Sequence, residues 1–488
     1  MRRTKLLVTI GPASTSTAVV DRLLALGTDA FRINFSHGTD TEHRAALLGL
    51  RSAADRVKRE VALVADLQGP KIRIGDLRGG SIVLDVGHHW RLDTRPEPGD
   101  LLRAPVSLPE LTRSVRPGDP LLLGDGVVEL VVSSVEAGGV DATVVHGGSV
   151  SSHAGLFLPR AQLRAEILGP KDRHDLEVAL SGGADFIALS FVRDGADVRS
   201  ARKRIMAAGR PEVGLIAKIE RAEALKNIDG ILDAADGIMV ARGDLGIEVP
   251  LERLALEQKS LVAKANAANT PVIVATQMLL SMVTSPRPTR AEATDVANAV
   301  LDGADAVMLS EESAVGRFPV EAVEWLDRIC RATEGAIRPR SPAVTGPPSA
   351  AGSAEVAVAA AAVRLAEEVG AVAIVTPTHS GRTARLVAAS RPSTPVLAIS
   401  SLGATRRRLA LTWGVEAFEC PAELPLDALR TFAERLAASR PGARPGAPLV
   451  LTAGYPVEGR PTNLVTALEV GRPRGSARPG RGRATGRG

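Results

Sequence analysis

Apolar runs alternate with amphipathic stretches along most of the chain, and this rhythm predicts parallel strands joined by helices. Three such runs precede residue 70 and five more follow residue 160. They cover residues 5–10, 29–34, 61–66, 185–190, 213–219, 235–241, 270–276 and 304–310. Eight strand–helix units in about 250 residues are typical of a (β/α)8 TIM barrel. The expected fold class is therefore α/β, with the barrel built from residues 1–69 and 160–338.

The rhythm breaks in two places. Between residues 70 and 159, short apolar runs are separated by Gly, Pro and Asp without a helical period, which predicts an inserted small β-barrel lid. A Pro/Gly/Ser-rich linker begins near residue 338, and helix and strand patterns then alternate again. We expect a C-terminal α/β domain over residues 339–471. The Arg/Gly-rich residues 472–488 have the composition of a disordered tail.

Composition narrows the functional classes. The chain has 488 residues, of which 45% are hydrophobic and 24% charged, so wholesale disorder is excluded. The longest apolar run, residues 356–363, is far shorter than the roughly 20 residues of a membrane-spanning helix, and the apolar run at the N-terminus is too short for a signal peptide. Two cysteines cannot form a disulfide framework or a thiolate cluster. These features predict a cytoplasmic protein without a membrane partner.

The net charge of +5 comes from the tail, which holds six arginines and no acidic residue. Without it the chain is nearly neutral. Aromatic residues make up only 2% of the sequence, which argues against a base-stacking surface. We therefore do not expect nucleic acid as a partner and interpret the tail as a solvated end.

Polar residues collect where the predicted barrel strands end, the position at which such barrels carry their active sites. They are Arg32, Asn34, Ser36, Asp66, Ser190, Lys218, Glu220, Arg242, Gly243, Asp244, Thr276, Gln277, Ser310 and Glu312. Any single one is also explained by nearness to solvent, whereas the set from seven strands indicates a site.

Two carboxylates on adjacent strands, Glu220 and Asp244, suit Mg²⁺, which takes few carboxylates together with water and substrate oxygens. Lys218 lies two residues before Glu220 and so on the same face of the strand. A structural salt bridge remains the alternative. A metal and fixed cations are what phosphoryl transfer requires, because negative charge must be stabilised with little covalent help.

The chain resembles the pyruvate kinase family at this point. The resemblance rests on the blocks RINFSHG, ADLQGPKIR, LIAKIERAEAL, ADGIMVARGDLGIEVP and VATQMLLSM, followed by PRPTRAEATDVANAVLDGADAVMLSEESA, in the order and spacing of that family. It covers roughly residues 4–470. It implies Mg²⁺-dependent phosphoryl transfer from phosphoenolpyruvate to ADP, giving pyruvate and ATP, with Mn²⁺ as a possible substitute metal.

The resemblance also implies residue roles. Glu220 and Asp244 would bind Mg²⁺, and Lys218 would stabilise the phosphoryl group in transfer. Thr276 would lie near the substrate methylene, and the backbone of Gly243 and Asp244 would hold the substrate carboxylate at a helix N-terminus. Arg32 and Arg73 would contact phosphate. The residues that would bind the nucleotide are Asn34, His37 and Arg73.

Many family members also need K⁺, and Asn34, Ser36, Asp66 and the carbonyl of Leu67 match its oxygen cage. K⁺-dependent members carry Glu after Gly-Pro, where this chain has Lys71. An ammonium there supplies the charge that K⁺ otherwise brings. We therefore expect activity without K⁺.

Two positions depart from the family pattern. The strand returning from the lid usually carries a nucleotide-binding Lys, but this chain has Ala154 there, preceded by His153. Glu311 replaces a common Gly, which we interpret as a tolerated variant. The departure at Ala154 leaves open a second hypothesis, a catalytically impaired phospho-metabolite sensor on the same scaffold. A third is another Mg²⁺-dependent barrel enzyme, a mutase or lyase, which would need no ADP.

In the C-terminal domain, Ser380, Gly381, Arg382 and Thr383 open a helix and offer backbone donors and hydroxyls to an anion. In the family a similar turn binds a phosphate-bearing effector, while an ordinary helix N-cap is the alternative. The family also implies a homotetramer.

Overall fold

The computed structural model describes residues 2–70, 72–106, 111–124, 126–158, 166–337, 354–421, 424–454 and 462–471. The chain divides into two compact units, Met1–Ala336 and Ile337–Gly488. The expected linker at 338–353 and the expected tail at 472–488 lie outside the described ranges. Within those ranges, no helix has the length and apolar character needed to cross a membrane.

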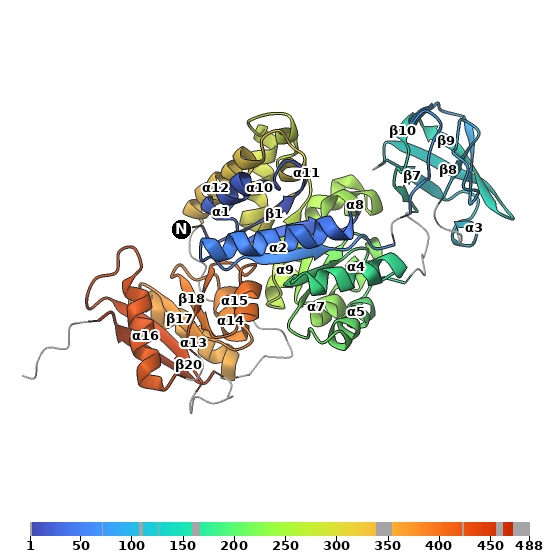
Figure 1. Ribbon diagram of the computed structural model, residues 1–488. Helices are drawn as coiled ribbons and strands as arrows, with labels where there is room; N and C mark the ends of the chain where they lie inside the picture. The colour runs from blue at the N-terminus through green and yellow to red at the C-terminus, as the bar shows by residue number, and fades with distance from the viewer. Residues whose placement is uncertain are drawn as a thin grey trace, which may run out of the picture. The chain divides into compact units, whose positions relative to one another are not determined.

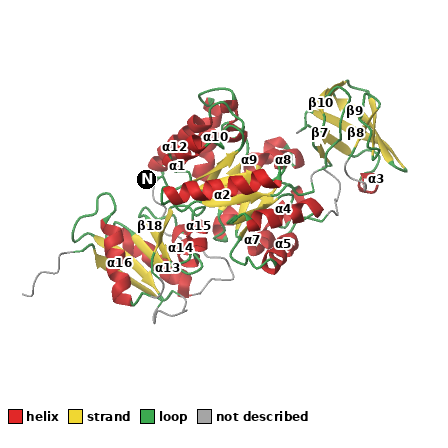
Figure 2. Ribbon diagram, viewed as in Figure 1, coloured by secondary structure: helices red, strands yellow, loops and turns green. Residues whose placement is uncertain are grey.

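Eight parallel strands close into a barrel, as the apolar runs predicted (Figures 1 and 2). They are β1 (Lys5–Ile10), β2 (Ala30–Asn34), β3 (Ala62–Asp66), β12 (Phe186–Leu189), β13 (Gly214–Ile219), β14 (Gly237–Ala241), β15 (Val272–Ala275) and β16 (Ala306–Leu309). Nearly every residue of these strands is buried, because the strands face a packed interior on one side and helices on the other.

Helices surround this barrel and bury their apolar faces on it. They are α1 (Thr17–Ala25), α2 (Asp40–Arg56), α4 (Pro170–Ser181), α5 (Gly195–Ala207), α6 (Ala222–Lys226), α7 (Ile228–Ala234), α9 (Leu254–Ala267), α10 (Arg290–Asp302) and α12 (Pro319–Ala336). Their ends follow local chemistry. Helix α10 begins at a capping box of Thr289 and Glu292 and ends at Gly303 with φ of 101°.

Short helices follow two strand ends. The family resemblance implied a helix N-terminus at Gly243 and Asp244, whereas sequence reasoning missed the second helix. Helix α8 (Arg242–Glu248) begins where β14 stops, and α11 (Glu311–Ala314) begins one residue after β16. Two 3₁₀ turns, Leu251–Arg253 and Leu280–Val283, were also missed. Elements of three to seven residues are too short for a helical period to be visible in the sequence.

In its described residues, the insertion is all-β apart from the one-turn helix α3 (Leu111–Ser114). Its strands are β4 (Ser81–Leu84), β5 (His89–Asp93), β6 (Arg103–Pro105), β7 (Pro120–Leu123), β8 (Val128–Glu136), β9 (Gly139–His146), β10 (Gly148–Ser151) and β11 (Leu156–Phe157). Among the described strands, pairing is divided between a six-stranded sheet and the pair β4–β10. The division falls at Gly147, where a Cβ would lie 2.5 Å from the carbonyl oxygen of Leu84, so only glycine allows the chain to pass from one sheet to the other.

The described part of the C-terminal unit forms an α/β sheet of five strands in the order β19-β18-β17-β20-β21. Its strands are β17 (Ile374–Pro377), β18 (Val396–Ser400), β19 (Val415–Glu419), β20 (Pro448–Ala453) and β21 (Leu464–Glu469), and its helices are α13 (Ala354–Glu368), α14 (Arg382–Ala389), α15 (Gly403–Leu409) and α16 (Leu426–Ala438). Alternate strand residues face α13 and α14 on one side and α16 on the other.

Candidate active site at the carboxyl ends of the barrel strands

Strand pairing brings the predicted site residues to one end of the barrel. Asn34, the last residue of β2, lies opposite Asp66, the last residue of β3. Ser190 follows β12, Lys218 lies in β13, and Glu220 follows that strand. Asp244 belongs to the first turn of α8, and Thr276 follows β15.

Lys218 is the centre of this cluster. Its Nζ donates to Ser190 Oγ at 2.8 Å and lies 2.8 Å from Glu220 Oε1 and 3.2 Å from Asp66 Oδ1. The lysine side chain is 12% exposed, and the two carboxylates are 1–2% exposed. A single ammonium therefore lies between two buried carboxylates and retains a small opening to solvent.

Arg32 completes the charge balance on the other oxygen of Asp66. Its Nε lies 2.6 Å from Asp66 Oδ2, and its Nη1 donates to Thr9 Oγ1 at 3.1 Å. Burial opposes the charge of Asp66, but Lys218 and Arg32 outweigh it and lower the pKa of the Asp66 carboxyl. Asp66 is thus an anion that holds two cations at the barrel mouth.

The ion pairs around Lys218 also keep its side chain protonated. Burial by itself lowers the pKa of a lysine, but Asp66 and Glu220 outweigh burial here and raise the pKa of Lys218 above its ordinary value. The side chain is therefore a permanent cation at physiological pH.

Glu220 and Asp244 are the candidate metal ligands. Burial raises the pKa of Glu220, Lys218 opposes the shift, and Asp244 adds to it. Phe191 N donates to Glu220 Oε2 at 2.6 Å, whereas Oε1 is buried and accepts no well-aligned hydrogen bond, although Lys218 is within ion-pair distance. An incompletely satisfied buried carboxylate oxygen beside a second carboxylate fits a divalent cation.

No group of three or more His, Cys, Asp or Glu side chains suited to a metal occurs among the described residues. Two protein carboxylates leave most positions of a six-coordinate ion to water or substrate. That is how Mg²⁺ is commonly held at phosphate-binding sites.

Thr276 and Gly243 are in contact just beyond the carboxyl ends of β15 and β14. Gly243 N donates to Thr276 Oγ1 at 2.8 Å, and this hydroxyl donates to Ala275 O at 2.6 Å. Thr276 and Gln277 have φ of 71° and 55°, a region that residues with a Cβ rarely occupy. Such backbone strain is concentrated at functional sites.

Two predicted members of the set have structural contacts instead. The guanidinium of Arg242 binds Asp295 at 2.6 Å and the carbonyl of Thr276 at 2.6 Å. Glu312 is fully buried and accepts the N–H groups of Leu279, at 2.9 Å, and Ser310, at 2.7 Å. These side chains hold the loops after β14, β15 and β16.

Two of the four residues expected to form a K⁺ cage have an oxygen that accepts a hydrogen bond from a protein donor. Asn34 Oδ1 accepts Ser36 N at 3.1 Å, and the carbonyl of Leu67 accepts Ser190 Oγ at 2.7 Å. Lys71, expected to replace the cation, lies outside the described residues.

Within the insertion, Arg73 is tied to the returning strand. It forms a β-bridge with Gly155, and its Nη1 donates to the carbonyl of His153 at 2.9 Å. His153 Nε2 lies 3.0 Å from Asp76 Oδ1, and Ala154 packs against the core of the insertion. None of these described contacts joins Arg73 to the strand-end cluster.

The candidate effector turn also has internal contacts. Gly381, with φ of 82°, directly precedes α14, and its N–H donates to Thr378 Oγ1 at 2.9 Å. Arg382 pairs with Glu355 at 2.7 Å, and the Thr383 hydroxyl lies 2.6 Å from that of Thr462. The N-cap of α14 is Gly381, which has no side-chain capping hydrogen bond, so the structure does not show an ordinary N-cap at Ser380 or Thr383, and none of these described contacts identifies an anion site.

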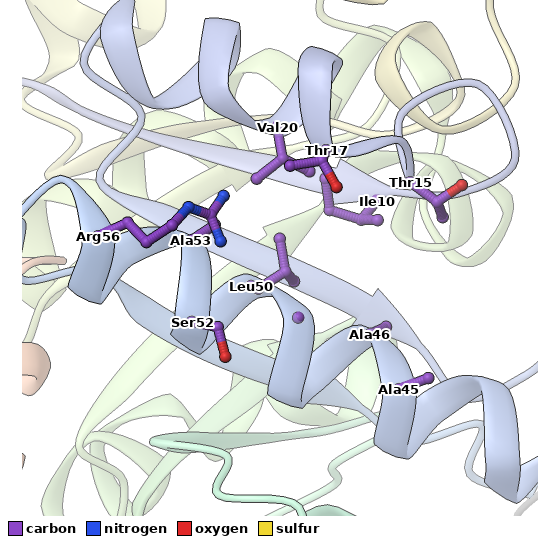
Figure 3. Close-up of a pocket in the computed structure, with 11 residues that line it drawn as sticks. Ile10, Thr15, Thr17, Val20, Ala45, Ala46, Leu50, Ser52, Ala53 and Arg56 are labelled. Atoms are coloured by element: carbon purple, nitrogen blue, oxygen red, sulfur yellow. The ribbon is translucent and has the colours of Figure 1, made fainter.

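A cavity of about 180 Å³ lies between α1 and α2 (Figure 3). Ile10, Val20 and Leu50 form its apolar surface, and Arg56 lies at one end. The guanidinium of Arg56 is paired with Asp21 at 2.9 Å. None of the predicted site residues lines this cavity, so the chemistry is assigned to the strand ends and not to the cavity.

Comparison with known proteins agrees with this architecture. Residues 1–323 match the family model for the pyruvate kinase barrel domain, and residues 356–467 match that for its alpha/beta domain. Curated pyruvate kinases of Geobacillus stearothermophilus and Corynebacterium glutamicum are 41% and 43% identical, over 95% and 93% of this chain and 80% and 94% of theirs. The crystal structure of a pyruvate kinase from Cryptosporidium parvum superposes with a TM-score of 0.89 at 35% identity, covering 96% of each chain. The chain therefore belongs to the pyruvate kinase family.

Proposed function

We propose that this protein transfers the phosphoryl group of phosphoenolpyruvate to ADP with Mg²⁺, forming pyruvate and ATP. The observation that carries the proposal is the buried ammonium of Lys218 held between Asp66 and Glu220. A fixed cation beside a candidate metal site is what a loose, anionic phosphoryl transition state requires. Family membership supports the same reaction.

Each proposed role uses a group with a defined position. Lys218 and Arg32 bind the phosphoryl oxygens, and Arg73 contributes from the insertion. Glu220 and Asp244 would hold Mg²⁺, or Mn²⁺ in its place, which would supply positive charge beside the transferring group. Thr276 lies near the methylene that receives a proton, and the backbone of Gly243 and Asp244 binds the substrate carboxylate.

We further propose that nucleotide lies on the side of Asn34 and His37, and that the reaction needs no K⁺. Lys71, at the position where K⁺-dependent members of the family carry Glu, supports the second point. A phosphate-bearing effector at Ser380–Thr383, a homotetramer and a cytoplasmic setting complete the proposal.

The test is the formation of pyruvate and ATP from phosphoenolpyruvate, ADP and Mg²⁺. We expect equal amounts of both products and none without ADP or metal. Pyruvate formed without ADP would favour the mutase or lyase hypothesis. Tight phosphoenolpyruvate binding without turnover would favour the sensor hypothesis, which the comparisons do not support.

A further inference from the structure

The loop between β2 and α2 carries three proposed site residues, Asn34, Ser36 and His37, and its shape is unusually constrained. Phe35 is completely buried, and its N–H donates to the carbonyl of Asp66 at 2.9 Å. Lys171 Nζ, from α4, donates to the carbonyl of Phe35 at 2.8 Å. The loop is therefore held at Phe35 from both sides.

The carbonyl of His37, further along the same loop, is bound by the side chain of His43 in α2. The Nε2 atom of His43 lies 2.8 Å from His37 O. Since a carbonyl oxygen only accepts hydrogen bonds, Nε2 carries the proton. The other ring nitrogen, Nδ1, is buried and has no hydrogen-bond partner within the described structure. The N–H group at Nε2 of the ring therefore donates to the loop.

The position of the His43 ring is itself fixed. It is 5% exposed and stacks on Phe35, with ring centroids 4.0 Å apart. A capping box between Thr39 and Glu42 fixes the first turn of α2. At Gly38, φ is 91°, and an added Cβ would lie 3.3 Å from both Glu42 Oε2 and His43 Nε2. The close packing around Gly38 and the His43 ring therefore restricts the loop to one conformation.

We propose that His43 is a positioning residue for nucleotide binding, which acts by holding the carbonyl of His37 and, through it, the loop from Asn34 to Gly38. This inference rests on the proposed function, because that function assigns the loop to the nucleotide side. His43 is buried and its donor is engaged, so it acts through the loop and does not touch substrate. A purely structural core histidine is the competing explanation.

Two variants separate these explanations. His43→Phe keeps an aromatic ring against Phe35 but removes the donor. His43→Gln removes the ring but places an amide N–H near the position of Nε2. Leu47→Val is the matched control, because Leu47 is a fully buried residue of the same helix, one turn after His43, that packs beside Gly182. All proteins are compared below their own midpoints of thermal unfolding.

The measurement is the dissociation constant of ADP with Mg²⁺ by calorimetry, together with that of phosphoenolpyruvate. We expect His43→Phe to weaken ADP binding about fivefold to tenfold, the effect of losing one hydrogen bond. We expect His43→Gln to stay within about twofold of the wild type, and phosphoenolpyruvate binding to change little in either variant.

The inference is overturned if His43→Gln binds ADP as weakly as His43→Phe, or if His43→Phe binds it as tightly as the wild type. If His43→Phe lost affinity for ADP and for phosphoenolpyruvate in parallel, the inference would also be overturned. Such a parallel loss is what general destabilisation would cause, and Leu47→Val measures that effect. Because binding is measured without turnover, a failure of the proposed reaction would appear separately, as wild-type protein that binds ADP but forms no ATP.

Discussion

The ammonium of Lys218 lies 2.8 Å from Oε1 of Glu220, at the carboxyl end of β13. The two residues are separated by one position in sequence and face the same side of an extended segment. The strand thus presents a cation for the phosphoryl group and a ligand for the metal as one rigid unit. This relationship underlies the account of catalysis given above.

Asp66 should be a large contributor to stability because it is the common partner of Lys218 and Arg32. We expect Asp66→Asn to lower the free energy of unfolding by about 3 kcal/mol or more, since breaking a buried ion pair leaves charge uncompensated. Asp21→Asn is the control, because Asp21 pairs with Arg56 at an exposed site and should cost less than about 1 kcal/mol. Denaturant unfolding at pH 7 measures both. Equal small effects would contradict the prediction.

The effect of Asp66 should depend on pH in one direction. Its folded-state pKa is lowered, so its contribution is present above the unfolded value of about 3.9 and is lost as the pH falls below it. The difference in unfolding free energy between wild type and Asp66→Asn should therefore be constant from about pH 5 to 8 and shrink below about pH 4. A difference that grows on acidification would contradict this sign.

The two neighbouring glutamates after the eighth barrel strand should contribute very differently to the free energy of unfolding. Glu312 is buried and accepts two backbone N–H groups, whereas Glu311 is exposed. Glu312→Gln turns one acceptor into a donor that opposes an N–H group, and should lower the free energy of unfolding by about 2 kcal/mol. Glu311→Gln should change it by less than about 0.5 kcal/mol. A similar loss in both variants would rule out the proposed loop-holding role of Glu312.

The sequence was sufficient to predict the barrel, because its strands are short, almost wholly apolar runs between helical patterns. It also led to the residues at the strand ends. It did not reveal β19 and β21, which lie at the two edges of the C-terminal sheet and mix exposed and partly buried residues. An edge strand with one covered face leaves a weak apolar signal.

Side-chain direction was also beyond the sequence. Arg242 and Glu312 occupy strand ends just as Lys218 and Glu220 do, yet they turn into the protein to bind backbone groups. The role proposed for His43 depends on a contact with His37 six residues earlier, across a turn that only the fold defines. A glycine followed by a capping box was the one local signal that this loop is constrained.

Ala154 gives a prediction for the insertion. The family resemblance leads us to expect lysine at this position, and Ala154 is only partly buried, beside a histidine paired with Asp76. Ala154→Lys adds a cation near the proposed nucleotide phosphates, and should lower the KM for ADP about threefold to tenfold while leaving the KM for phosphoenolpyruvate nearly unchanged. Ala154→Gln is the control of similar length. An equal change with Gln would show that charge is not the cause.

The monovalent-cation requirement gives another prediction. The wild type should have full activity in tetramethylammonium buffer free of K⁺, Na⁺ and NH₄⁺. Lys71→Glu should create a dependence on K⁺, because a carboxylate then replaces the fixed positive charge. Steady-state rates with and without added K⁺ measure this. A many-fold rise of wild-type activity on adding K⁺ would overturn the proposal.

The most direct test of the central claim is kcat for ADP-dependent pyruvate formation in Lys218→Met. Lys226→Met, at an exposed lysine of the following helix, is the matched control. We expect a loss of about 10³-fold in kcat for Lys218→Met, since a cation at the transferring phosphoryl group has an effect of this order. Phosphoenolpyruvate should still bind, and the control should be unchanged. A folded Lys218→Met protein that retains kcat within about tenfold of the wild type would contradict the role assigned to Lys218.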